Sequence, residues 1–317
     1  MLQSLMHFTE LLHNYIFLTF LALAILTTFN ILSNVFTQKS QDQKAFAIIF
    51  DVFASIFALL IFFLIRQNQN YDQGYLFAIH FNTTNTWLLL IPILTIILYT
   101  IADTLRFIPT KHLAPSTKQI TGTFLTIISV TMSYFIYNDI EITLLKILGI
   151  ILIIALNIIL AKSFQNTKKN ITNRKSKHIK YLLISIFVYT LFGIAGGLDK
   201  MSSKIIGVEA YNLLVWILPT IFMFIFAFPS VKNIPNEIKK VGIFKIAFLA
   251  FLNVTMYFTF LKALQYGPAF NVLAILGLVN ITTFLAESIF LKHKVKNKLL
   301  QGILALLSTI GVVLIVR

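Results

Sequence analysis

Uninterrupted apolar runs of about twenty residues recur along the whole sequence and constrain the fold more than any other feature. Hydrophobic residues make up 58% of the 317 positions, and charged residues only 12%. An ordinary soluble domain has about 25% charged residues. A run of about 20 apolar residues can cross the hydrocarbon core of a bilayer as a helix. The sequence therefore predicts an all-α polytopic membrane protein.

Ten such runs alternate with short polar loops. Because backbone polar groups inside a bilayer must be paired within their own segment, each run is expected to be a helix. Strands of a membrane β-barrel would instead alternate in polarity over about ten residues. The predicted spans are Tyr15–Asn34, Ala45–Ile65, Trp87–Leu105, Gln119–Tyr137, Leu144–Lys162, Tyr181–Leu198, Val208–Phe228, Ile243–Leu261, Pro268–Phe290 and Leu299–Val316.

Short motifs recur at about half the chain length and indicate an internal duplication. Leu105-Arg106-Phe107-Ile108-Pro109 resembles Leu264-Gln265-Tyr266-Gly267-Pro268, and Leu144-Leu145 before Gly149 resembles Leu299-Leu300 before Gly302. Five spans per half is an odd number, so the copies should be inverted, as in many secondary transporters. We predict two inverted five-helix repeats, at residues 1–165 and 181–317, joined by a basic linker at 166–180. Superposing the halves should need a two-fold axis in the membrane plane.

The order of these motifs resembles the drug/metabolite transporter superfamily, in particular its EamA-like branch with ten helices. Lys39 and Lys200 follow the first helix of each half, and an aromatic–X–Pro turn (Phe107–Pro109 and Tyr266–Pro268) precedes the fourth helix of each half. Charged hinges follow at Asn138–Glu141 and Leu291–Lys294, where the family usually has Gly-Glu. The second hinge lacks the acid and carries His293, and Asp51 lies in the region where an early Arg is usual.

The resemblance implies a helical bundle that works by alternating access without ATP. It further implies a central cavity lined mainly by the first, third, fourth, sixth, eighth and ninth helices. No cofactor is implied.

Polar side chains inside the predicted spans are the candidates for a solute site, because a polar group in hydrocarbon needs a partner or a water-filled cavity. Asn280, Thr283 and Glu287 share one helix face. Glu287 could bind a coupling ion, or it could pair with Lys292 or Lys294. Asp51 is a second ion-coupling candidate, whereas Asp103 is expected to pair with Arg106 three residues on. The predicted substrate-binding residues are Asn30, Asn34, Ser129, Tyr189, Trp216, Asn253, Tyr257, Asn280 and Thr283.

Gly193 and Gly197 form a GxxxG pair, which is predicted to allow close helix packing. The sequence contains no cysteine, no P-loop and no nucleophile motif, and its histidines lie in predicted loops or termini. We therefore expect no catalytic residues, no metal site and no enzyme activity.

The net charge of +15 is explained by lipid rather than nucleic acid, because the cations flank apolar runs. Of the 26 Lys and Arg residues, 20 lie in loops on one predicted side of the membrane and 6 on the other. By the positive-inside rule both termini should lie on the outer, non-cytoplasmic side of the cell membrane. The family's usual arrangement places both termini inside. A cytoplasm-only reporter fused after Arg317 would distinguish the two.

These features together favour a secondary carrier of a small polar organic solute, such as an amino acid, by uniport or proton coupling. The first alternative is an exchanger of nucleotide-sugars or phosphorylated metabolites, which Lys or Arg in the cavity would favour. The alternative of another class is a membrane-embedded enzyme or lipid flippase. The expected partners are the solute and anionic lipid headgroups, in a monomer or homodimer.

Overall fold

The computed structural model describes residues 14–68, 86–110, 115–137, 143–165 and 175–290, with isolated positions between 303 and 315. Within these ranges the chain is helical apart from short turns and contains no strand. The elements are α2 (Tyr15–Thr37), α3 (Gln43–Asn68), η2 (Thr86–Leu89), α4 (Leu90–Thr110), α5 (Pro115–Tyr137), α6 (Leu144–Gln165), α7 (Lys175–Ile206), α8 (Val208–Phe226), η3 (Phe228–Asn233), α9 (Ile234–Val241), α10 (Ile243–Tyr266), α11 (Ala269–Leu276) and α12 (Val279–Phe290).

Several of these helices have the length and composition of membrane spans. In the described chain six are long and apolar enough, namely those over Tyr15–Thr37, Gln43–Gln67, Thr86–Arg106, Lys180–Ile206, Val208–Phe226 and Ile243–Tyr266. Shorter apolar helices cover Phe124–Tyr137, Leu144–Leu156 and Ala269–Thr283. The predicted all-helical, multi-pass membrane architecture is therefore confirmed at this coarse level.

The outer helix faces carry large exposed apolar side chains. On α8, Ile221 and Ile225 are 53% and 72% exposed, whereas Trp216, Thr220 and Met223 on the opposite face are buried. Such a surface would be a liability in water but is the surface that lipid tails solvate. The side chains that face inward from α2, α3, α8, α10 and α11 form one contiguous apolar core.

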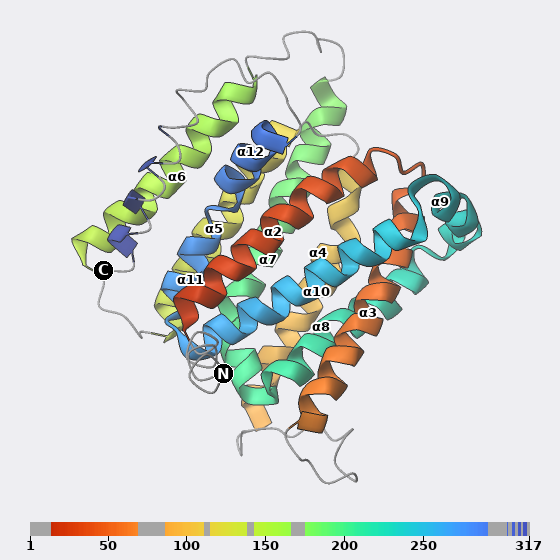
Figure 1. Ribbon diagram of the computed structural model, residues 1–317, viewed down its shortest axis with the longest axis horizontal. Coiled ribbons are helices and arrows are strands. Elements are labelled where there is room, and N and C mark those ends of the chain that lie inside the picture. Colours follow the sequence, from red (N-terminus) through yellow and green to blue (C-terminus); the bar gives the residue numbers. More distant parts are fainter. Residues whose placement is uncertain are drawn as a thin grey trace, which may run out of the picture.

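The helices lie side by side in a slanted bundle (Figure 1). The helix α2 packs along α10, α7 packs along both α4 and α5, and α3 packs along α8. We call one end of the bundle the α9 end, where the loop between α2 and α3 meets α9. The opposite end, the Gly207 end, contains the turn between α7 and α8 and the turn between α10 and α11 (Figure 1).

Turns at two glycines set helix ends. Gly207 separates α7 from α8 with a φ of 93°, and Gly242 separates α9 from α10 with a φ of 95°. Both values lie in the left-handed region, which glycine adopts without a Cβ clash. At the start of α2, the Asn14 side chain accepts hydrogen bonds from the backbone N–H groups of Ile16 (2.9 Å) and Phe17 (3.3 Å), as an N-cap residue does.

Besides shifts of a few residues at several helix ends, the structure differs from the predicted spans in three larger features. The expected ninth span is broken, because α11 ends at Leu276 and α12 begins at Val279. The sixth span is longer than predicted, since α7 runs from Lys175 to Ile206 and includes the last residues of the predicted linker. A short amphipathic helix, α9, lies between the seventh and eighth spans and was not predicted. The predicted tenth span lies largely outside the described residues.

Candidate functional site: a central cavity

A cavity of about 370 Å³ lies in the middle of the bundle, between helices of both halves of the chain. Its walls come from α2, α4, α5, α7, α8, α10, α11 and α12. On α2 and α4 the lining continues to Thr37 and Pro109, which are at or next to the ends of those helices. Both helices end at the α9 end (Figure 1). The cavity therefore reaches toward the α9 end of the bundle.

The cavity brings together side chains that are far apart in the sequence. All of the residues predicted to bind substrate line it, namely Asn30, Asn34, Ser129, Tyr189, Trp216, Asn253, Tyr257, Asn280 and Thr283. Asn30 on α2 lies 3.5 Å from the hydroxyl of Thr283 on α12 (Nδ2 to Oγ1), so these two helices meet at the cavity wall. The side chain of Glu287, the predicted ion-coupling residue on the same helix face, lies outside the described residues.

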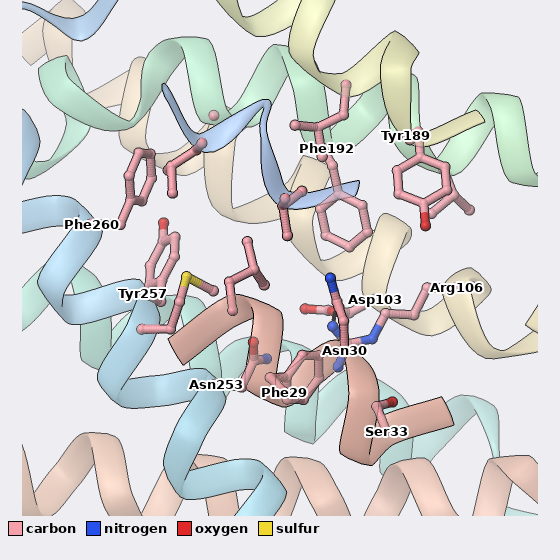
Figure 2. Close-up of a pocket in the computed structure, with 18 of the residues that line it drawn as sticks. Phe29, Asn30, Ser33, Asp103, Arg106, Tyr189, Phe192, Asn253, Tyr257 and Phe260 are labelled. Atoms are coloured by element: carbon pink, nitrogen blue, oxygen red, sulfur yellow. Dashed lines mark ion pairs between the residues drawn. The ribbon is translucent and has the colours of Figure 1, made fainter. Parts of the chain in front are cut away.

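A partly buried ion pair forms part of the cavity wall. Arg106 and Asp103 on α4 both line the cavity, and their Nη1 and Oδ1 atoms are 3.0 Å apart, as the i, i+3 spacing predicts. Figure 2 shows this pair beside Asn30, with Tyr189 and Phe192 facing it. The guanidinium also lies 5.2 Å from the ring centre of Phe50 on α3. The pair therefore presents one positive and one negative group among neutral amides and aromatic rings.

Asp51, the other predicted ion-coupling residue, lies behind this wall. Its side chain on α3 is buried and does not line the cavity. It interacts electrostatically with Asp103 and Arg106. Asp51 therefore places a further ionisable carboxyl group behind the pair without reaching the cavity in this conformation.

Aromatic rings close the cavity toward the Gly207 end. Tyr257 packs edge-on against Tyr99 and Trp216, with ring centres 5.7 Å and 6.1 Å apart, and Phe192 and Phe260 extend the cluster. The indole N–H of Trp216 is buried and has no hydrogen-bond acceptor in the described part of the chain. A buried donor without a partner is costly, so this N–H is suited to a solute or a bound water.

Next to this aromatic cluster, toward the Gly207 end, lies a buried carboxylate that the sequence analysis did not identify. Asp199 on α7 is 0% exposed and accepts hydrogen bonds from three tyrosine hydroxyls on three other helices. The donors are Tyr99 on α4 (2.6 Å), Tyr211 on α8 (2.7 Å) and Tyr257 on α10 (3.0 Å). The predicted sixth span ended at Leu198, one residue earlier, which placed Asp199 in a loop. An aspartate inside the span would have been a functional candidate by default.

The glycines predicted to pack helices lie where α7 crosses α5. A Cβ on Gly193 would come within 2.9 Å of the Ile128 Cβ, and a Cβ on Gly197 within 2.6 Å of the Met132 Cβ. At these distances a residue larger than glycine would fit only if the α5 and α7 backbones moved apart. A Cβ on Gly122 of α5 would lie 3.4 Å from the Asn280 amide at the cavity wall, which is an ordinary contact.

Comparison with known proteins gives the family of this helical bundle. Residues 177–317 match the model of the EamA-like transporter family. Over this part of its length the chain is similar to the EamA-like transporters. No curated protein matches the chain. A solved structure described only as "Crystal structure of protein" is similar over 94% of each chain, with a TM-score of 0.67 and 11% sequence identity, which is a likeness of fold alone.

The EamA-like match confirms the family predicted from the motif order and indicates a membrane transporter of the drug/metabolite type. The residues of α7 and of all later helices that line the cavity lie inside the matched region. The described part of the chain contains no cluster of three or more His, Cys, Asp or Glu side chains placed to hold a metal ion.

Proposed function

We propose that the chain is a secondary transporter that carries a small zwitterionic solute, an amino acid or a related metabolite, by alternating access. The observation that supports this most strongly is the Arg106–Asp103 pair in the wall of an amide-rich cavity. A cavity of about 370 Å³ is at the small end of the range of about 300–1,000 Å³ that is usual for ligand pockets. A solute the size of an amino acid fits such a volume.

The ion pair favours a solute with charges of both signs. A guanidinium binds a carboxylate through parallel hydrogen bonds, and a carboxylate binds an ammonium group. The amides of Asn30, Asn253 and Asn280 can donate and accept, so they suit either end of such a solute. Trp216 offers one more donor. In this proposal the solute carboxylate binds at Arg106 and the solute ammonium group at Asp103.

An exchanger of nucleotide-sugars or phosphorylated metabolites is the second candidate, and the presence of Arg106 in the cavity favours it. A phosphate dianion would need an excess of positive charge around it. Here Asp103 lies 3.0 Å from Arg106, and Asp51 adds a further carboxylate behind them. The wall therefore carries no net positive charge in this region, which ranks the phosphorylated solutes second.

Pairwise packing supports the proposed ten-helix arrangement of two inverted repeats. In this arrangement α2, α3, α4 and α5 of the first half correspond to α7, α8, α10 and α11–α12 of the second half. Exchanging each helix with its counterpart turns the contact of α2 with α10 into the contact of α7 with α4. The contact of α5 with α7 becomes that of α11 and α12 with α2, and α3 with α8 maps onto itself. Gly122 faces Asn280 while Gly277 faces Thr126, so the central crossing repeats the same exchange.

The two ends of the bundle support a carrier that is open toward the α9 end. The cavity lining continues along α2 and α4 to that end, whereas the tyrosine cluster around Asp199 fills the other. The described cations near the α9 end include Lys39, Lys44, Lys232, Lys239 and Lys240, and they lie on the side for which the sequence predicts 20 of the 26 cations. By the positive-inside rule this end faces the cytoplasm of the cell membrane, and the termini lie outside.

The test is solute counterflow into liposomes that contain the purified protein, after a thermal-shift screen with a metabolite panel has named candidate solutes. The initial probe is a ¹⁴C-labelled mixture of the standard L-amino acids. We expect saturable uptake against a preloaded unlabelled mixture. No counterflow of amino acids, together with exchange of phosphorylated metabolites, would favour the second candidate. Scrambling of labelled lipid in the same vesicles would indicate a flippase instead.

Variants of the ion pair test the proposed binding mode. Arg106→Gln should reduce counterflow at low solute concentration by about tenfold or more, because hydrogen bonds to charged groups contribute about 1.5–3 kcal/mol. Asp103→Asn should reduce it by a similar factor. The matched control is Lys262→Gln on α10, which removes a cation that does not line the cavity and should leave counterflow unchanged. Equal effects of all three variants would argue against specific binding at the pair.

A further inference from the structure

The strongest unexplained feature of the molecule is the Asp199 cluster at the boundary between the cavity and the closed Gly207 end. Its carboxylate is fully buried, yet two of the groups that bind it, Tyr99 and Tyr257, also line the cavity. Tyr211 is buried on the other side of the carboxylate, nearer the turn at Gly207. Asp199 therefore lies between the solute cavity and the end of the bundle that must open to complete a transport cycle.

The same carboxylate ties four helices together. Oδ2 accepts from Tyr99, and Oδ1 accepts from both Tyr211 and Tyr257, so α7 is joined to α4, α8 and α10. An ionised carboxylate can accept about four hydrogen bonds, but a protonated one has become a donor at one oxygen. Adding a proton would therefore weaken or reverse at least one of these three contacts. The charge state of Asp199 and the closure of this end are physically linked.

Helix α7 has a weak point beside Asp199. The hydroxyl of Tyr137 on α5 donates to the backbone carbonyl of Gly197 (2.7 Å) and accepts from the backbone N–H of Met201 (3.1 Å). In an uninterrupted α-helix these two backbone groups would bond to each other, and a side chain inserted between them is a recognised cause of bending. Asp199 lies midway between the two residues, so a change at its carboxylate acts where α7 bends most easily.

Other charged and titratable groups around α7 are directed elsewhere. Lys200 donates to the carbonyl of Gly267 at 3.0 Å and lies over the Tyr137 ring. Asp103 and Arg106 on α4 pair with each other nearer the α9 end. Besides the three tyrosines, no ionisable side chain in the described part of the chain makes a hydrogen bond or ion pair with Asp199.

We propose that Asp199 is the proton-binding site that couples solute movement to a proton gradient, an inference that rests on the proposed transport function. Tyr257 or Tyr99 accepts a proton from a hydronium ion in the cavity, which leaves a neutral water, while its own hydroxyl proton passes to the carboxylate. The new O–H bond on Asp199 loosens the contacts to α4, α8 and α10, and α7 bends between Gly197 and Met201, where the Tyr137 hydroxyl of α5 is inserted. The Gly207 end opens, the proton leaves through Tyr211, and the restored carboxylate closes that end again.

The test compares two assays in liposomes containing the full-length protein, with the ¹⁴C-labelled mixture of standard L-amino acids as probe. The first assay is counterflow without a pH gradient, and the second is accumulation driven by a pH gradient of one unit, applied in both directions. One proton per solute should concentrate the solute up to about tenfold in one of the two directions, because tenfold corresponds to about 1.4 kcal/mol. Internal pyranine fluorescence should report proton movement only when solute is present.

The key variant is Asp199→Asn, which keeps the size of the side chain but cannot bind the proton. We expect it to retain counterflow and lose accumulation and the pyranine signal. The matched control is Glu209→Gln, which neutralises a half-buried carboxyl two residues before Tyr211 and should retain all three. Tyr211→Phe, which removes one donor outside the cavity, should weaken gradient-driven accumulation and spare counterflow.

The outcomes separate this inference from the proposed function. Absence of wild-type counterflow would contradict the transport proposal itself. Wild-type counterflow without any response to pH gradients would overturn only the coupling role of Asp199, even if the variant did not fold. The coupling role of Asp199 would also be overturned if Asp199→Asn still accumulated solute under a pH gradient. A loss of accumulation in Asp51→Asn but not in Asp199→Asn would assign that role to Asp51 instead.

Discussion

At the residue scale, two carboxylates hold the α9 end of the bundle together. Glu237 on α9 is 1% exposed, and its Oε1 atom accepts from the backbone N–H groups of Gln41 and Asp42, both at 2.8 Å. Asp42 in turn caps α3 by accepting from the backbone N–H of Lys44 and accepts from the side chain of Asn233 (2.7 Å). These contacts fix the loop between α2 and α3 to the unpredicted segment before α10.

The pH dependence of stability should reveal the contribution of Asp42. Partial burial raises the pKa of Asp42, but hydrogen bonds from Asn233, Ala45, Ser230 and Lys44 together lower it below its ordinary value. A carboxyl with a lowered pKa in the folded state stabilises that state above its unfolded pKa of about 3.9 and loses this effect as the pH falls.

We therefore expect Asp42→Asn to lower the melting temperature in detergent at pH 7, with the difference from wild type shrinking as the pH falls below about 4. The control is Asn236→Ala, an exposed change on α9 that should have little effect at any pH. A difference that stays constant between pH 7 and pH 3 would contradict this role of the ionised carboxylate.

At the scale of elements, the crossing of α5 and α7 depends on two glycines one turn apart. The backbone of α7 approaches α5 so closely that a methyl group at Gly193 or Gly197 would collide with a neighbouring Cβ. Gly196, on a different face, has no atom closer than 3.8 Å to such a methyl group. The three positions form a natural set of test and control sites in one helix.

Substitution by alanine should separate these positions. Gly197→Ala and Gly193→Ala should each destabilise the fold by about 1–3 kcal/mol through overpacking. Gly196→Ala should be neutral or slightly stabilising, because alanine favours helix over glycine by about 1 kcal/mol. Melting temperatures in detergent give the measurement. A loss of stability in Gly196→Ala as large as in Gly197→Ala would refute the close-packing explanation.

Much of the helix order could be read from the sequence, because apolar runs in lipid have few alternatives to the helix. The break between α11 and α12 was missed, since a single glycine, Gly277, interrupts an otherwise continuous apolar run and its position is fixed by contact with Thr126 on α5. Helix α9 was missed because it is short and polar on one face. The end of α7 was placed too early because the adjacent Asp199 and Lys200 resemble the end of a span.

The candidate site was accessible to sequence reasoning where the polar residue was a costly amide in the middle of a span, as with Asn30, Asn253 and Asn280. It was not accessible where the partners come from distant helices. Three tyrosines on α4, α8 and α10 converge on Asp199, and no spacing within the chain indicates that convergence. The role of Arg106 as a cavity group likewise depends on how α4 turns relative to α2.

At the scale of the whole molecule, transport by alternating access requires the two ends of the bundle to open in turn. Helices from both halves line the cavity, which reaches the α9 end, while the Asp199 cluster fills the Gly207 end. The chain contains no cysteine, so single cysteines can be introduced into the natural sequence without removing any native thiol. Thr37 lines the cavity at the α9 end, and Ser203 is buried near the Gly207 end.

The most direct test of alternating access is the rate at which a hydrophilic maleimide labels Thr37→Cys and Ser203→Cys in purified protein. Without solute, Thr37→Cys should react faster than Ser203→Cys. A saturating solute identified by counterflow should slow labelling at position 37 and speed it at position 203, because the solute allows the closed end to open. Labelling rates that do not respond to solute, or that change in the same direction at both ends, would contradict alternating access in this protein.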